Sequence, residues 1–492
     1  MRKFLNDLKN TVKKYRPPKY VIFTVFLVLV LLAFFKNSVF DPDTWFLLNH
    51  GRYVFEHGIP HIEPFTMHEG FEFVMQQWLS SSIFWFLYSK FGIIGLQFLA
   101  GVLFGITIYF LYKLCMLVSK QKFYLSSAIT IITCSLLLIQ TVLRPQLFDN
   151  LIFAMELYYL ELYIRKKKNK YLIALPILSL LLVNLHASMW FMLFIFMLPY
   201  FIDGFNIDLK FIKSEGYNKK PLFIVFIIML LIAFINPYGL DAMTYVFRSY
   251  GFSSVNRVVG EMRPLDVTIL PGKVELIIVF GVLFIYMFNK QNNIKLRYLL
   301  LFCGLTYLLF AHHRNLSLFL IGVLFQLADC LSNKFKCYTS KYKGRKYTNI
   351  LYVTCCFILI GYSIFIFGTG HYDNQNEPLG AIEYITKNYD VTKLKIYTAY
   401  TDGSCAEYHK LKVYLDARAE VFLKANNKKE DVFSEYYKLQ FLNGDGAKFL
   451  EKYKFDLLIL GKLDNLKNYK DKNYKLVYKD DYREVWELIK KE

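Results

Sequence analysis

The chain has 492 residues, of which 55% are hydrophobic and 18% aromatic, and it carries a net charge of +20. This composition is too apolar for a soluble protein of that length, and the apolar residues lie in long runs with few charges. Such runs predict transmembrane helices, because each must cross roughly 30 Å of hydrocarbon. The composition therefore excludes a soluble globular protein and indicates a polytopic membrane protein.

Eleven spans are expected in chain order. The first span is followed by no small-residue cleavage site, which predicts a retained anchor and not a cleaved signal peptide. The stretch 79–90 is too short to cross alone and is interpreted as an interfacial or re-entrant helix. The expected spans are 20–36, 93–118, 123–142, 147–164, 171–185, 188–203, 221–236, 273–289, 296–311, 315–331 and 349–369. An odd number of spans places the two termini on opposite sides of the membrane.

Basic residues are distributed unequally between the two sets of loops. With a cytoplasmic N-terminus, the inner segments hold 27 Lys and Arg, whereas the outer segments up to residue 315 hold 6 over a comparable length. This positive-inside bias predicts the orientation and accounts for the excess charge, so no nucleic-acid partner is implied. Of the eight cysteines only Cys405 falls in an expected outer segment, which excludes a disulfide framework and predicts that Cys405 can be labelled from outside.

The composition changes after the last span. Residues 370–492 hold 22 basic and 21 acidic residues and alternate helix-like and strand-like segments. Strands are expected at 394–399, 412–415, 455–460 and 474–478, and helices at 379–388, 430–442 and 446–453. The predicted fold is thus an α-helical polytopic membrane domain, 1–369, followed by a small extracytoplasmic α/β domain, 370–492.

Polar side chains collect at the outer ends of the expected spans. All nine histidines fall on this side, together with Asp41 and Asp43 after the first span. Acidic residues favour helix N-termini, so capping of the helix that starts near Thr44 explains one aspartate well and two less well. Arg144 and Arg314 stand in very short outer loops against the charge bias, and binding a phosphate or carboxylate is the expected reason. The histidines lack the close spacing of a zinc site.

Several short motifs, in order along nearly the whole chain, resemble the C-type glycosyltransferase superfamily (the GT-C fold), whose members include the protein mannosyltransferases. These motifs are DPDTW at 41–45, GR at 51–52, QWL at 77–79, LRPQL at 143–147, NLH at 184–186, NPYG at 236–239, HRN at 313–315 and YLDARAE at 414–420. The resemblance implies a GT-C-like fold and an enzyme that takes a sugar from a polyprenyl-phosphate carrier at the outer membrane face. It also implies that an aspartate of the first outer loop acts on the acceptor and that arginines hold the lipid phosphate.

The implied chemistry assigns roles to the outer residues. A base must reach the proton of the acceptor, and cationic donors stabilise the phosphate that leaves in a single, inverting attack. We expect Asp43 to be the base, with Asp41 as its orienter or as the alternative base. The residues expected to bind substrate or phosphate are Arg52, Arg144, Gln146, His186, Arg263, His313, Arg314, Asp416 and Arg418.

The expected partners are a polyprenyl-phosphate-linked sugar, an envelope glycan or protein acceptor, and membrane lipid, at the cytoplasmic membrane. These residues identify no cofactor with certainty, and the involvement of a divalent metal is left open. Two other functions are also left open. One is a transporter or flippase of an envelope lipid or polymer, which the intramembrane acid Glu156 would favour, and the other is a non-catalytic envelope-assembly protein.

Overall fold

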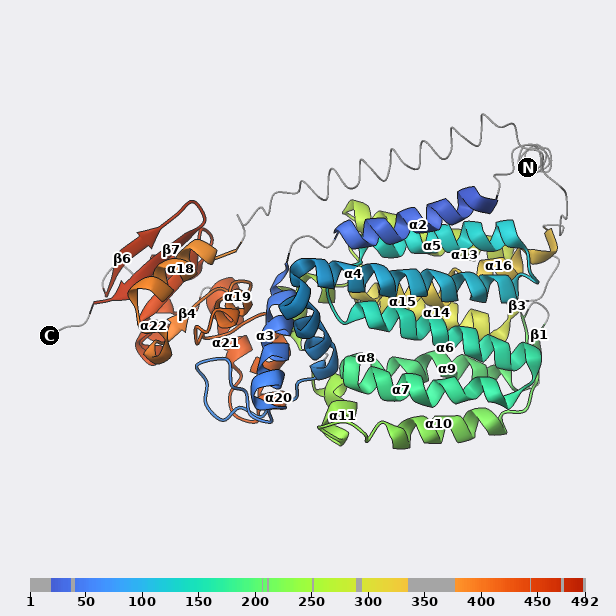
Figure 1. Cartoon of the computed structure of the whole chain (residues 1–492), viewed down its shortest axis with the longest axis horizontal. Helices are drawn as coiled ribbons and strands as arrows, with labels where there is room; N and C mark the ends of the chain where they lie inside the picture. The colour runs from blue at the N-terminus through green and yellow to red at the C-terminus, as the bar shows by residue number, and fades with distance from the viewer. Residues whose placement is uncertain are drawn as a thin grey trace, which may run out of the picture.

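The structure is a computed structural model of the whole chain. It describes residues 19–36, 40–205, 207–209, 212–249, 252–288, 294–334, 377–442, 444–469 and 473–489. Figure 1 shows a bundle of helices that run side by side, with a smaller part that contains a sheet at one end. The expected span 349–369 and the expected boundary between residues 369 and 370 fall outside the described residues.

The helices of the bundle coincide with the expected spans. Their bounds are α2 Lys19–Lys36, α4 Trp78–Val118, α5 Phe123–Ile139, α6 Gln146–Lys166, η1 Asn169–Ile173, α7 Ala174–Leu185, α8 Ala187–Trp190, α9 Met192–Asp203, α10 Lys220–Ile232, α13 Leu270–Met287, α14 Leu296–Ala311, α15 Leu316–Val323 and α16 Gln326–Cys330. Among the described residues, α2, α4 and α13 are long and apolar enough to cross a membrane. Five further apolar helical stretches of the bundle have 10–17 residues, namely Phe123–Ile139, Asn169–Leu185, Ala187–Asp203, Lys220–Ile232 and Leu296–Ala311. The predicted polytopic helical class is confirmed.

The stretch 79–90 forms the first arm of α4. This 41-residue helix breaks at Gly92, where φ is 59° and ψ is −152°. Glycine adopts positive φ without the steric cost that a Cβ atom would bring, so the chain can turn there before the apolar part of α4 begins. The first arm packs against α3 (Pro42–His57). Their approach requires Gly51, because a Cβ atom there would lie 2.1 Å from the carbonyl oxygen of Ser81.

The C-terminal part is built on a four-stranded mixed sheet with the order β4-β5-β7-β6. Strand β4 (Ile396–Tyr397) runs parallel to β5 (Leu457–Gly461), and β7 (Arg483–Leu488) lies antiparallel between β5 and β6 (Tyr474–Lys479). The predicted helices are present as α18 Leu379–Asn388, α21 Val432–Phe441 and α22 Gly446–Tyr453. The predicted strand 412–415 makes only a single bridge, between Val413 and Ile396, and β7 was not predicted.

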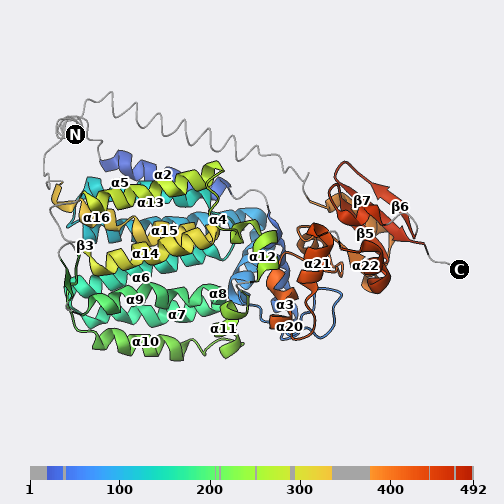
Figure 2. The ribbon, with the colours of Figure 1, turned by 180° about the vertical axis from the view of Figure 1, so that it is seen from behind.

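The remaining elements are short and join these two parts. They are α11 Leu240–Ser249, α12 Ser253–Val258, η2 Gly260–Met262, η3 His313–Asn315, α19 Gly403–Tyr408, η7 Ala419–Phe422 and α20 Lys424–Asn427. Two-residue strands β1 Asp208–Leu209, β2 Ile212–Lys213 and β3 Ile294–Lys295 form a small sheet at the opposite end of the bundle. Figures 1 and 2 both show α3, α11 and α20 at the end of the bundle that faces the C-terminal part.

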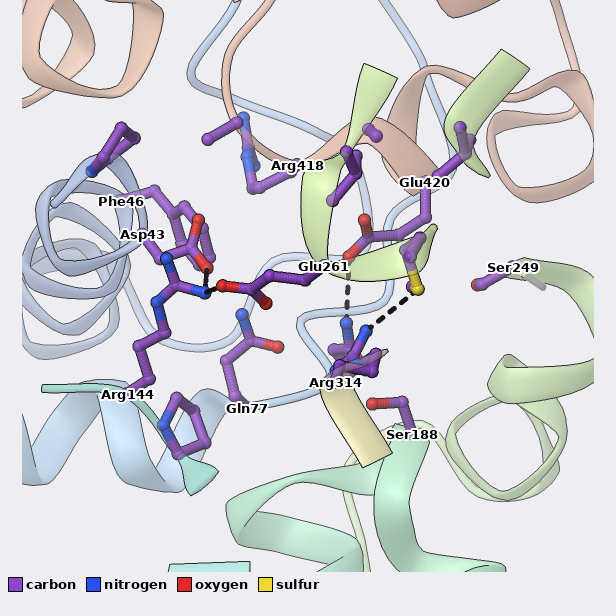
Figure 3. Close-up of a pocket in the computed structure, with 18 of the residues that line it drawn as sticks. Asp43, Phe46, Gln77, Arg144, Ser188, Ser249, Glu261, Arg314, Arg418 and Glu420 are labelled. Atoms are coloured by element: carbon purple, nitrogen blue, oxygen red, sulfur yellow. Dashed lines mark hydrogen bonds and ion pairs between the residues drawn. The ribbon is translucent and has the colours of Figure 1, made fainter. Parts of the chain in front are cut away.

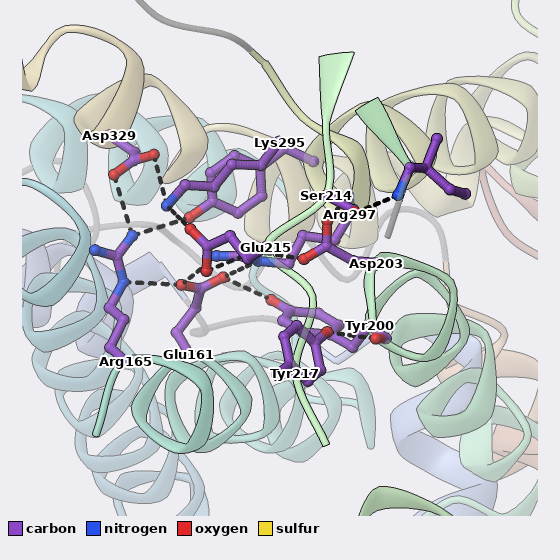
Figure 4. A network of polar contacts seen from close by, with 12 residues as sticks. Glu161, Arg165, Tyr200, Asp203, Ser214, Glu215, Tyr217, Lys295, Arg297 and Asp329 are labelled. Atoms are coloured by element: carbon purple, nitrogen blue, oxygen red, sulfur yellow. Dashed lines mark hydrogen bonds and ion pairs between the residues drawn. The ribbon is translucent and has the colours of Figure 1, made fainter. Parts of the chain in front are cut away.

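A buried ion network joins the helix ends that lie farthest from α3. Arg297 on α14 is fully buried, and its guanidinium reaches Glu161 of α6 at 2.8 Å and Asp203 of α9 at 2.7 Å. Figure 4 shows that Arg165, Lys295, Glu215 and Asp329 extend the same network. Each buried charge therefore has partners of opposite sign, which a charge away from water requires.

Candidate functional site

A cavity of about 350 Å³ opens where α3, the α5–α6 connection, the α7–α8 junction and the segment 417–420 meet. Its wall includes six of the predicted site residues, which are Asp43, Arg144, Gln146, His186, Arg314 and Arg418. Figure 3 shows that the labelled side chains of this set come from opposite sides of the cavity. Residues more than 370 positions apart in the sequence are thus brought to one site.

Asp43 and Arg144 form the charged centre of the site. Nη1 of Arg144 lies 3.0 Å from Oδ2 of Asp43 and 2.7 Å from Oε1 of Glu261. Figure 3 shows the two carboxylates meeting this guanidinium from the same side. Asp43 comes from the first turn of α3, Arg144 from the α5–α6 connection and Glu261 from η2. The site therefore depends on three chain segments that are distant in sequence.

Burial raises the pKa of Asp43 to about 7. The positive charge of Arg144 opposes this effect, whereas the negative charges of Asp41, Glu261 and Glu420 raise the Asp43 pKa further. A carboxyl group with this pKa is divided between its acid and base forms near neutral pH. Such a group is suited to accept a proton, because a general base works best when its pKa lies near the working pH.

Asp41 has a different role from Asp43. It is the N-cap of α3, and its Oδ1 accepts hydrogen bonds from the backbone nitrogen of Thr44 at 2.7 Å and from the Thr44 hydroxyl at 2.6 Å. Its second oxygen, Oδ2, accepts from Nε of Arg144 at 2.7 Å. Asp41 does not line the cavity. The capping interpretation therefore describes Asp41, which also orients the guanidinium that faces Asp43.

Arg314 and Glu420 lie on the side of the cavity opposite Arg144 (Figure 3). Arg314 follows α14, and its Nη1 lies 3.5 Å from the sulfur of Met262. Glu420 accepts a hydrogen bond from Nε2 of Gln76 at 2.9 Å. Burial raises the pKa of Glu420, and the charge of Arg314 lowers it. The two predicted arginines thus border one cavity from separate connections between helices of the bundle.

Arg418 connects the C-terminal part to α3 and to the segment between α3 and α4. Its Nη2 donates to Glu63 at 2.9 Å and to Asp416, and its Nη1 lies 3.1 Å from Nε2 of His50. The guanidinium is almost fully buried, at 2% exposure, between the rings of Phe65 and Phe73. The element 414–420 therefore both connects the two parts of the protein and borders the cavity. Asp416 lies behind Arg418, away from the cavity wall.

Besides Asp416, three predicted binding residues lie away from the cavity. Arg52 donates to the carbonyl of Tyr408 at 2.8 Å and stacks on its ring at 4.8 Å. Arg263 is exposed and donates to the carbonyl of Arg257 at 2.9 Å. His313 lies 2.7 Å from Glu275, whose carboxylate raises the His313 pKa. These contacts give each of the three a structural partner.

Several cavity residues were not predicted as site residues. Glu261 and Glu420 bring two further carboxylates, and Gln76 and Gln77 precede α4. Asp149, in the first turn of α6, lies behind His186 with its Oδ2 2.7 Å from Nδ1 of the imidazole. An acid in the first turn of a predicted span was the available signal for Asp149, since an intramembrane acid usually has a partner.

A ligand set for a resident metal ion is not present among the described residues. No group of three or more His, Cys, Asp or Glu side chains is arranged there to hold an ion. Asp41, Asp43 and Glu261, the acids nearest one another at the cavity, surround the guanidinium of Arg144. The cation that these carboxylates neutralise is therefore an arginine of the chain.

The fold is similar to solved membrane enzymes. No protein-family model matches the sequence, and no curated protein matches it. The crystal structure of the Archaeoglobus fulgidus oligosaccharyltransferase, tethered with an acceptor peptide that contains the NVT sequon, matches with a TM-score of 0.60 at 12% identity. The match covers 96% of this chain and 74% of that chain. Structures of ArnT from Cupriavidus metallidurans, bound to undecaprenyl phosphate and in the apo state, match with TM-scores of 0.49. Their identities are 10% and 11%, over 95% of this chain and 97% of theirs.

The likeness to the oligosaccharyltransferase confirms the GT-C-like fold expected from the sequence motifs. At this identity the likeness concerns the fold, which places the chain among helical, multi-pass membrane proteins with an additional C-terminal part.

Proposed function

We propose that this chain is a membrane glycosyltransferase that moves a sugar from a polyprenyl-phosphate carrier to an acceptor at the outer face of the cytoplasmic membrane. The observation that carries the proposal is the Asp43 carboxylate, which borders a cavity beside Arg144 in a GT-C-like fold. A titratable acid and cationic donors around one cavity are the minimum set for transfer from a phosphate leaving group.

In the proposed reaction Asp43 accepts the proton of the acceptor group. The acceptor atom forms a bond to the anomeric carbon as the bond from that carbon to the phosphate oxygen breaks. The electron pair of that bond leaves with the phosphate, whose negative charge increases. One such displacement inverts the configuration of the anomeric carbon. Asp41 orients Arg144, so it acts on the reaction through a second residue.

Arg144 and Arg314 are the proposed partners of the lipid phosphate. Both border the cavity, and guanidinium groups bind phosphate through two parallel, charge-assisted hydrogen bonds. Arg144 already contacts three carboxylates, which hold it in place before a donor arrives. Arg314 lies across the cavity, where it can neutralise charge that develops on the departing phosphate.

The transporter alternative has weaker support in the described residues. Glu156 of α6 is fully buried, neither of its carboxylate oxygens accepts a hydrogen bond from a described residue, and it does not line the cavity. A proton pathway requires a series of titratable groups across the membrane. The acids Asp43, Glu261 and Glu420 instead gather at one end of the bundle.

Replacing Asp43 by Asn tests the proposal. Asn keeps the shape of the side chain but does not accept a proton at neutral pH, so Asp43→Asn should lose transfer by at least about 100-fold while the protein still folds. Transfer is measured with purified protein and radiolabelled polyprenyl-phosphate sugars. Asp41→Asn should retain more activity, because Asn is as good an N-cap as Asp.

The matched control is Asp445→Asn, which changes the N-cap of α22 in the C-terminal part and should leave transfer unchanged. If Asp43→Asn transfers sugar at the wild-type rate, Asp43 is not the base. If Asp41→Asn is inactive while Asp43→Asn is active, the two aspartates have exchanged roles.

A further inference from the structure

One wall of the cavity collects hydrogen-bond acceptors that have no donor. The side-chain carbonyl oxygens of Gln76, Gln77 and Gln146 are buried, and within the described residues none accepts a hydrogen bond. All three side chains border the cavity, and Figure 3 shows Gln77 between Arg144 and Arg314 in that view. Buried acceptors are normally paired, so a set of unpaired ones on a cavity wall indicates a ligand that donates hydrogen bonds.

His186 adds a fourth acceptor to this wall. Its Nδ1 lies 2.7 Å from Oδ2 of Asp149, and both residues are buried, at 5% and 2% exposure. A carboxylate can only accept, so Nδ1 carries the hydrogen, and in the neutral form of imidazole the lone pair is then on Nε2. His186 borders the cavity, where Nε2 is the nitrogen left for a ligand. Asp149 is thus a positioning residue that sets the tautomer of His186.

The backbone holds these acceptors side by side. The carbonyl of Gln76 accepts from the backbone nitrogen of Ala187 at 2.8 Å. Nε1 of Trp78 donates to Asn184 at 3.0 Å, and the hydroxyl of Ser80 donates to the carbonyl of Leu185 at 2.7 Å. The segments 76–80 and 184–187 are therefore joined by three hydrogen bonds, which hold Gln76, Gln77 and His186 in place before a ligand binds.

We propose that Gln76, Gln77, Gln146 and His186 form the subsite for the sugar ring, and that this subsite takes a neutral, hydroxyl-rich sugar. The inference rests on the proposed function and deepens it. Hydroxyl groups are the donors that four acceptors require, whereas a carboxylate or phosphate added to the sugar would offer these four atoms no hydrogen to accept. The phosphate of the donor lies toward Arg144 and Arg314, and the sugar lies against the acceptor wall.

A comparison of two ligands tests the subsite by binding alone. The probes are a short-chain prenyl phosphate and the same prenyl phosphate that carries a glucosyl, mannosyl or N-acetylglucosaminyl group, titrated into purified protein. Wild type should bind one of the sugar-bearing probes at least about 10-fold more tightly than the bare phosphate. Gln146→Leu should reduce this preference by about 3- to 10-fold and leave the affinity for the bare phosphate unchanged.

Gln140→Leu is the matched control, because Gln140 ends α5 and does not border the cavity. It should retain the full preference for the sugar-bearing probe. Equal affinity of wild type for the bare and sugar-bearing probes would overturn the subsite while leaving the proposed function standing, provided that transfer is still observed. A sugar preference without transfer would keep the subsite and overturn the proposed function.

Two substitutions of His186 separate binding from a purely structural role. In His186→Gln the amide reaches the position of Nε2, whereas in His186→Asn the amide replaces Nδ1 and keeps the contact with Asp149. The subsite predicts that His186→Gln retains the sugar preference and that His186→Asn loses about 3- to 10-fold. The reverse order would show that His186 serves only to hold Asp149. Nitrogen NMR of the His186 ring should show hydrogen on Nδ1 in wild type, and hydrogen on Nε2 would overturn the positioning role of Asp149.

Discussion

Asp43 is surrounded by charges of both signs, and each of these charges shifts its pKa. Burial raises its pKa to about 7, and the negative charge of Glu261 adds to this effect. The reaction requires the carboxylate form, so transfer should rise as the pH increases through about 7 and then level off. Removing the charge with Glu261→Gln should lower the Asp43 pKa and move the rising limb to lower pH.

This prediction is measured as a pH–rate profile of transfer. Wild type at pH 6 should keep roughly a tenth of its plateau rate, and Glu261→Gln should exceed wild type in relative rate at that pH. Glu420→Gln should act in the same direction and less strongly, because Glu420 contributes less to the shift. A limb that moves to higher pH in Glu261→Gln would contradict the assignment of Asp43 as the titrating group.

At the residue scale the sequence indicated which residues gather at one end of the helices better than the contacts of each side chain. Asp43, Arg144 and Arg314 were identified because they stand at outer helix ends, and all three border the cavity. Arg52 satisfied the same criterion but stacks on Tyr408, a contact that no local pattern predicts. Asp149 was missed because its partner, His186, lies 37 positions away in the sequence, and no local pattern links the two residues.

At the scale of elements, hydrophobic length predicted the bundle well and short strands poorly. Each described span was found because an apolar run long enough for a bilayer has few alternative structures. Gly92 explains why the sequence pattern predicts two helices, 79–90 and 93–118, where the structure has one helix with a break. Strand β7 was missed because Arg483, Glu484 and Glu487 interrupt its apolar pattern. It is stabilised by pairing on both sides, with β5 and β6.

The ion network of Figure 4 should stabilise the helix ends that lie farthest from the cavity. Arg297→Met removes the guanidinium that pairs with Glu161 and Asp203, and it leaves both carboxylates buried without that partner. Loss of one partner from a buried ion pair typically costs about 3–5 kcal/mol, so the variant should unfold at a clearly lower temperature in detergent. Lys387→Met, which breaks an exposed pair with Glu383, is the control and should change the unfolding temperature little.

At the scale of the whole molecule, the C-terminal part and the bundle share the site. Trp45 of α3 donates to Glu377 at 3.0 Å, and Arg52 donates to Tyr408, so α3 is fastened to the C-terminal part near the cavity. Burial raises the pKa of Glu407 well above its usual range, and Arg418 also pairs with Asp416 and Glu63. The cavity is closed on one side by residues 417–420 of the C-terminal part, so this part lies against the end of the bundle that carries α3.

The orientation of the chain in the membrane is a prediction about the whole molecule. The structure determines which positions can test it. Cys405 was expected to react with reagents from outside, but its side chain is only 2% exposed, so labelling of this thiol reports unfolding and not topology.

Lys475→Cys on β6 offers an exposed position in the C-terminal part, and Lys168→Cys offers one in the loop after α6, at the opposite end of the bundle. With a membrane-impermeant maleimide, intact cells should label Lys475→Cys and not Lys168→Cys, and lysis should make both reactive. The bias of 27 inner against 6 outer basic residues is the reason for this expectation. Labelling of Lys168→Cys alone in intact cells would place the cavity on the cytoplasmic side and overturn transfer at the outer face.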